Sequence, residues 1–148
     1  MKSPEQIQKD VLEYLDKRFG LGEDVFKKHR FYLASKGRLF LGPKWVPDDR
    51  KIVTVGILAG RAGNSIKPTT NLLQAFGNRV SRNFIELDRE RTIQFARGQD
   101  LALDDAGGAT DGYVLLRYKN TQLGCGLLRG RSVRNMLPKA KRLDVSFL

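Results

Sequence analysis

The chain has 148 residues, of which 27 are Lys or Arg and 16 are Asp or Glu, so its formal charge is +11. Apolar residues make up 41% of the chain and charged residues 29%, which favours a folded domain over a disordered one. No apolar run approaches the ~20 residues of a membrane span, and the N-terminus lacks the apolar segment of a signal peptide, so we expect a cytoplasmic protein. Cys125 is the only cysteine and His29 the only histidine, which excludes an internal disulfide and a Cys/His zinc cluster.

The N-terminal segment predicts an amphipathic helix over residues 4–19. Ser3 is placed as its N-cap with Gln6 as a capping-box partner, and Gly20 as its C-terminal stop. A second short helix is predicted over residues 23–30, because basic residues gather at its C-terminal end.

A β-hairpin and a further strand are expected next. Residues 31–34 and 38–41 predict the hairpin, with the turn at 35–37. The β-branched run at 51–58 predicts a strand, and the glycine-containing stretch 59–65 a loop.

The middle of the chain predicts two helices and a strand. Residues 71–76 form a short helix that stops at Gly77, residues 83–87 a strand, and residues 89–96 a helix capped by Asp88.

The C-terminal third is predicted to be rich in strands. Residues 101–111 are predicted to form an acidic loop, and residues 113–118 and 123–128 are predicted to form a hairpin. Residues 131–137 and 141–147 are expected to supply closing strands. The fold class is α+β, and we place the boundary near 78–82, with an α+β domain over 1–80 and a β-barrel-like domain over 81–148.

Motifs for cofactor chemistry are weak or incomplete. Gly60 and Gly63 give a G-x-x-G pattern, but a strand leads into it rather than a helix. No glycine pair is followed by the Lys-Ser or Lys-Thr of a P-loop, and Gly124-Cys125-Gly126 lacks the rest of a dinucleotide fingerprint. Cys125 is more consistent with a core position than with a nucleophile, although a small enzyme built around it stays as a third hypothesis. We therefore expect no cofactor, no metal and no catalytic residue.

The positive charge is concentrated near the C-terminus. Residues 129–142 hold six basic residues and no acid, a pattern that favours a polyanionic partner because each phosphate contact releases counterions. A basic face that only maintains solubility is the alternative.

The order of features from Asn83 onward resembles a PUA domain, a small RNA-binding barrel. The resemblance rests on the strand at 83–87, the segment Phe95 to Leu101, residues 111–114 and above all Leu123-Gly124-Cys125-Gly126-Leu127. The upstream segment Ile66 to Gly77 resembles the pre-PUA region of archaeal proteins related to NOL1/NOP2/sun-type RNA methyltransferases and of ribosome-biogenesis factors.

This resemblance implies RNA binding without catalysis, because the related enzymes hold S-adenosylmethionine in a separate domain for which this chain has no room. We expect a stand-alone module that binds rRNA or tRNA in RNA modification or ribosome biogenesis, with a methyltransferase or pre-ribosomal proteins as possible partners and no membrane contact. The alternative function is a protein-interaction subunit that docks through its basic surface onto an RNA-modifying or ribosomal complex.

The candidate RNA-binding residues combine phosphate-binding cations, two glycines that would admit an RNA backbone, and one amide for a base edge or 2′-hydroxyl. Tyr113 and Tyr118 are candidates for base stacking. The candidate residues are Lys67, Arg79, Arg82, Gly124, Gly126, Arg129, Arg131, Arg134, Asn135, Lys139, Lys141 and Arg142.

Overall fold

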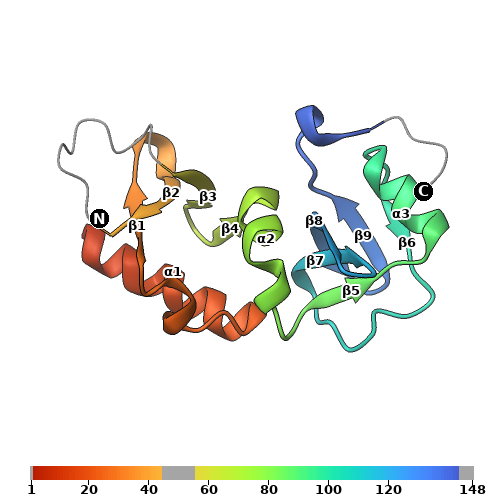
Figure 1. Ribbon diagram of the computed structural model, residues 1–148, viewed down its shortest axis with the longest axis horizontal. Helices are drawn as coiled ribbons and strands as arrows, with labels where there is room; N and C mark the ends of the chain where they lie inside the picture. The colour runs from red at the N-terminus through yellow and green to blue at the C-terminus, as the bar shows by residue number, and fades with distance from the viewer. Residues whose placement is uncertain (1, 45–55, 144–148) are drawn as a thin grey trace.

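The computed structural model describes residues 2–44 and 56–143, which form two sheets and three α-helices (Figure 1). The first sheet has the strand order β1-β2-β3-β4, and all its neighbouring strands are antiparallel. Its strands are β1 (His29–Leu33), β2 (Arg38–Pro43), β3 (Ile57–Ala62) and β4 (Ile66–Pro68).

The second sheet has the order β5-β7-β8-β9-β6, in which only the β5–β7 pair is parallel. Its strands are β5 (Phe84–Glu86), β6 (Leu101–Ala102), β7 (Gly112–Tyr118), β8 (Thr121–Arg129) and β9 (Ser132–Asn135). The predicted α+β class is confirmed. Along the long axis of Figure 1, α2 lies between the two sheets and α3 at the far side of the second.

All three helices are capped at their N-termini, two of them by the predicted residues Ser3 and Asp88. Helix α1 (Pro4–Phe19) begins at Ser3, whose hydroxyl accepts from the Gln6 N–H, and ends at Gly20 with a φ of 73°. The Gln6 side chain turns to Asp10 instead of completing the capping box. Thr69 and Asp88 cap α2 (Thr70–Phe76) and α3 (Arg89–Ala96) in the same way.

Two predictions for the first sheet and its surroundings are wrong, and a third lies mostly outside the described residues. The helix expected over 23–30 is a single 3₁₀ turn at Glu23–Phe26, and His29 and Arg30 already belong to β1. The loop expected over 59–65 is mostly strand β3, because Gly60 packs against the backbone of β4, a strand that the sequence did not suggest. Residues 51–55 of the predicted strand lie outside the described residues.

Two predictions for the second sheet also differ from the structure. The expected loop 101–111 begins with strand β6, which pairs with β9 and closes the sheet edge. Residue 141, the start of the last predicted strand, belongs to a 3₁₀ turn at Lys139–Lys141, and residues 144–147 lie outside the described residues.

Strand β7 separates two hydrophobic cores. Its alternation points Leu115 into a core built from α1, the first sheet and α2, whereas Val114 and Leu116 point into the core beneath α3. Cys125, opposite Leu115 on β8, also packs in the first core. The central residues of β7 are therefore buried on both faces of the second sheet, while the domain division at residue 80 stays a prediction.

Polar contacts fasten the second sheet to α1. The Arg18 guanidinium donates to the Tyr113 carbonyl at 2.7 Å and to the Thr110 hydroxyl and carbonyl at 2.7 and 2.6 Å. The Asn83 amide donates to the Arg18 carbonyl at 2.6 Å, and its oxygen accepts from the Thr110 N–H at 2.9 Å. Burial lowers the pKa of Arg18. We call the contact surface between α1, α2 and the second sheet the seam.

Candidate nucleic-acid interface

Strands β8 and β9 present a basic surface because of the two-residue alternation of β-structure. Along β9, Val133 and Asn135 are buried, whereas Ser132 and Arg134 are exposed. Ser132 pairs with Arg129 on β8, and Arg134 pairs with Leu127. These exposed side chains therefore share one face of the sheet, where Asp100 and Ala102 join them around a groove of about 530 Å³.

Three cations of this region are unpaired. In the part of the chain that the structure describes, the side chains of Arg129, Arg134 and Lys139 have neither a hydrogen-bond nor an ion-pair partner. We call these three residues the basic rim. Their charges are available to a ligand without loss of an internal contact.

The other three basic residues of this run are exposed but tethered. Arg131 donates to the Asp104 carbonyl at 3.4 Å and Lys141 to the Gln74 amide oxygen at 3.2 Å. Arg142 donates to the Leu137 carbonyl at 3.2 Å. Lys141 thus links the C-terminal 3₁₀ turn to α2, across the seam.

The cations predicted near the domain junction lie in different settings. Lys67 is exposed on β4, and Arg79 faces Asp24 at 3.7 Å. Arg82 donates to the backbone carbonyls of Asp16 and Lys17, the last-turn acceptors of α1. Arg82 therefore completes the C-terminal end of a helix.

The two predicted glycines do allow a close approach, but the approaching groups belong to the protein. A Cβ on Gly126 would lie 2.5 Å from Val133 Cγ1 and 2.8 Å from Leu116 Cδ2. A Cβ on Gly124 would meet Leu137 and Thr70, each at 3.0 Å. Both glycines are buried, so the structure corrects the expectation that an RNA backbone approaches them.

Asn135 is occupied by internal hydrogen bonds. Its amide nitrogen donates to the carbonyls of Phe95 and Gln99 at 2.8 and 2.9 Å, and its oxygen accepts from the Leu137 N–H at 2.9 Å. The residue is only 9% exposed. Asn135 therefore joins β9 to the end of α3 rather than reading a base edge.

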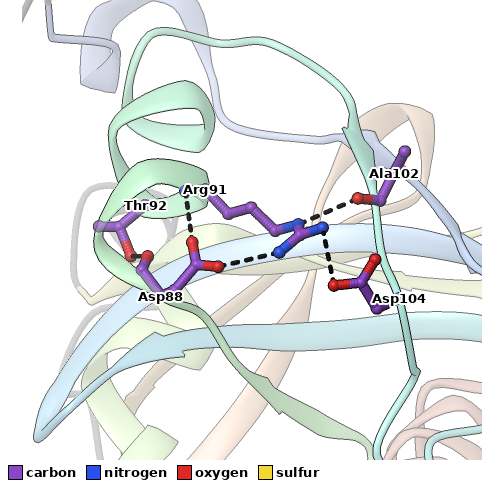
Figure 2. A network of polar contacts seen from close by, with 5 residues as sticks. All are labelled: Asp88, Arg91, Thr92, Ala102 and Asp104. Carbon is purple, nitrogen blue, oxygen red and sulfur yellow. Dashed lines mark hydrogen bonds and ion pairs between the residues drawn. The ribbon is translucent and has the colours of Figure 1, made fainter.

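Sequence reasoning missed Arg91, which fixes one wall of the groove (Figure 2). Its guanidinium bonds the carboxylate of the helix cap Asp88 at 2.9 Å and the Ala102 carbonyl of β6 at 3.0 Å, and it lies 3.5 Å from Asp104. Thr92 adds a bond to the Asp88 carbonyl at 2.8 Å. The i, i+3 spacing of Asp88 and Arg91 was the available signal, but the β6 contact is visible only in the fold.

The two tyrosines have distinct surroundings. Tyr113 packs against the first core, and burial raises the pKa of its hydroxyl. Tyr118 is half-buried beside the β7–β8 turn, with the Lys119 ammonium 5.3 Å from its ring centre.

Cys125 is a core residue, as its sequence context indicated. It is 1% exposed, and burial raises the pKa of its thiol to about 12. Because the thiolate is the nucleophilic form, the folded protein keeps this sulfur unreactive near neutral pH.

Among residues 2–44 and 56–143, no helix combines the length and apolar character of a membrane span. The same residues contain no group of three or more His, Cys, Asp or Glu side chains arranged to hold a metal ion.

Comparison with known families identifies the second sheet. Residues 82–143 match the family model described as the PUA domain of methyltransferase RsmF. The match covers α3 and all five strands of that sheet, so the curled sheet is a PUA-type pseudo-barrel.

Individual relatives agree with this match. The chain is 35% identical over 65 residues to ribosomal RNA small subunit methyltransferase F of Aeromonas hydrophila, which covers 44% of this chain and 13% of the relative. The protein of the same name in Shewanella woodyi is 37% identical over 57 residues, 38% of this chain and 12% of the relative. That of Psychromonas ingrahamii is 30% identical over 76 residues, 51% of this chain and 16% of the relative.

Residues 82–143 thus resemble the PUA domain of NOL1/NOP2/sun-type methyltransferases, as the sequence predicted. The matched segments span between 12% and 16% of the length of these relatives. The family match concerns the PUA domain and not a catalytic methyltransferase region.

Proposed function

We propose that this chain binds RNA through the basic rim and acts in rRNA modification or ribosome biogenesis in the cytoplasm, without catalysing a reaction itself. The observation that carries the proposal is the presence of unpaired cations on a PUA domain whose relatives are rRNA methyltransferases. Two of them, Arg129 and Arg134, line a groove. Arg129 and Arg134 project from one sheet face, so their guanidinium groups can contact successive phosphates.

The groove wall is held rigid before RNA arrives. Arg91 ties β6 to α3, and Asn135 ties β9 to the same helix. Binding then costs little ordering of the backbone, and the free cations need not leave internal partners.

A fluorescence anisotropy titration tests the proposal with small-subunit rRNA fragments and with total tRNA at two salt concentrations. We expect saturable binding whose affinity falls with salt, because phosphate contacts release counterions. Absence of RNA binding, together with tight RNA-free binding to an acidic protein, would instead support the protein-interaction alternative.

The non-catalytic part of the proposal has a separate test. Incubation of the chain with rRNA and radiolabelled S-adenosylmethionine should transfer no label to the RNA. Transfer of label by the purified chain would overturn this part and leave the RNA-binding part standing.

A further inference from the structure

A second, polar pocket lies on the PUA domain away from the basic rim. It has a volume of about 340 Å³, within the range of roughly 300–1,000 Å³ typical of small-ligand sites. The end of β5, the β7–β8 hairpin and the segment after α2 supply its polar lining. These residues are Asn78, Glu86, Arg117, Lys119, Asn120 and Gln122.

Arg117 is fixed at the base of this pocket. Its guanidinium lies 4.2 Å from the Phe84 ring centre, donates to Gln122 Oε1 at 2.9 Å and donates to the Gly77 carbonyl at 2.8 Å. The side chain is only 14% exposed. Because a guanidinium has five N–H groups and only two are hydrogen-bonded, this rigid group keeps donors for a ligand.

Glu86 stands beside Arg117 with its acceptors largely free. One carboxylate oxygen lies 3.7 Å from Arg117 Nη1, beyond hydrogen-bond distance, and the side chain is 53% exposed. The pocket thus offers a fixed row of donors next to a pair of charged acceptors. A phosphate group fits poorly there, because the carboxylate would repel it.

The hairpin geometry adds further polar groups. A register shift after Leu116 pairs Arg117 with Gln122, a bulge of the kind that redirects side chains. Within the described part of the chain, the side chains of Asn78 and Asn120 make no hydrogen bond. These two amides offer additional donors and acceptors at the pocket mouth.

We propose that this pocket binds an unpaired guanine base of the RNA. Guanine presents the acceptors O6 and N7 to arginine, the commonest specific arginine contact, and the donors N1–H and N2–H₂ to a carboxylate. O6 and N1 are on neighbouring ring atoms, just as the guanidinium and the carboxylate are neighbours in the pocket. Adenine places the acceptor N1 where guanine has a donor, so Glu86 would oppose it. The inference rests on the proposed RNA binding.

Heptauridine strands that carry one central guanine or one central adenine provide the test. We expect the guanine strand to bind the intact chain about tenfold more tightly, the size of effect typical of one good bidentate base contact. Replacing the guanine by inosine removes the N2 amino group that faces Glu86, and replacing it by 7-deazaguanine removes the N7 acceptor that faces Arg117. Each replacement should reduce the preference.

The variant Glu86→Gln should lower the guanine preference to less than about twofold, because the amide no longer offers two charged acceptors. Glu90→Gln is the matched control, since Glu90 is exposed in the first turn of α3 and removes the same charge outside the pocket. The control should keep the preference, and both variants should keep the salt dependence of binding.

Equal affinity for the two strands, or an unchanged preference in Glu86→Gln, would overturn this inference while the salt-dependent RNA binding stands. If neither strand binds, the proposed function fails in that assay. An NMR titration then tests separately whether the pocket binds guanine. Chemical-shift changes at the amides of Asn120 and Gln122 with guanosine monophosphate but not with adenosine monophosphate would support the pocket. Their absence would overturn it.

Discussion

Arginine side chains are hydrogen-bonded within the protein in the seam but are unpaired on the basic rim. In the seam, Arg18 makes three hydrogen bonds to Thr110 and Tyr113, residues more than 90 positions away in the chain. On the rim, Arg129 and Arg134 make none within the described residues. The same side chain thus organises the fold in one region and remains available for a ligand in the other.

The difference shows why a count of basic residues overstates a binding site. Arg82 was predicted to bind RNA, but its guanidinium is engaged by carbonyls of α1. A guanidinium that releases buried acceptors leaves them unsatisfied, which costs about 1–3 kcal/mol for each buried group, whereas water can bind exposed acceptors such as those of Arg82. Free donors, rather than charge alone, define the rim.

The largest expected effect comes from reversing the rim. The triple variant Arg129→Glu, Arg134→Glu and Lys139→Glu should lower RNA affinity by about 100-fold and reduce the slope of log affinity against log salt by roughly two. Anisotropy titrations at several salt concentrations measure both quantities.

The control for this variant is a triple reversal of Lys9, Lys27 and Lys28, which are exposed on the other half and change the net charge equally. An equal loss in the control would show that net charge, and not the rim, governs binding. Circular dichroism confirms that both variants are folded.

The seam should be sensitive to loss of Arg18. Arg18→Met leaves the Thr110 and Tyr113 carbonyls without their donor, so the free energy of unfolding should fall by about 2–3 kcal/mol. Urea denaturation measures this change. Thiol labelling of buried Cys125 at pH 8 should also accelerate, because the sulfur reacts only when the seam opens.

Lys17→Met is the neighbouring control, since among the described residues the Lys17 side chain makes only an exposed ion pair with Glu13. Its effect should stay below about 1 kcal/mol. Equal destabilisation by the two variants would mean that Arg18 does not hold the seam.

The variant Gly126→Ala tests whether Gly126 is needed for packing within the protein or for the approach of an RNA backbone. The added methyl would collide with Val133 and Leu116, so the free energy of unfolding should fall by about 1–3 kcal/mol. Gly63→Ala, with open space around its Cβ, should change stability much less. Unchanged stability with weakened RNA binding would restore the interpretation drawn from the sequence.

The smallest expected effect concerns Thr70, whose hydroxyl accepts from the Cys125 N–H at 3.0 Å across the seam. Thr70→Val keeps the shape but removes the acceptor, and should cost about 1 kcal/mol in thermal or urea unfolding. Thr121→Val, at an exposed position of β8, serves as the comparison. An equal loss in the free energy of unfolding at both positions would show that this hydrogen bond does not stabilise the seam.

The sequence by itself determined the elements whose signals are local. Ser3 and Asp88 cap their helices as predicted, because a cap depends on a side chain and an N–H three residues away. The high β-propensity of residues 113–118, which predicted β7, is local in the same sense. The Gly-Cys-Gly segment and its neighbours also sufficed to indicate the PUA family.

Only the tertiary structure decided which candidate residues are available for a ligand. Strands β4 and β6 are two or three residues long and exist because a partner strand satisfies their backbone groups. Asn135 and Gly126 were predicted to bind RNA, but long-range contacts bury them. The polar pocket joins residues 78, 86 and 117–122, which are separated in sequence. Exposure and hydrogen-bond partners depend on contacts between distant segments, and a local pattern does not contain those contacts.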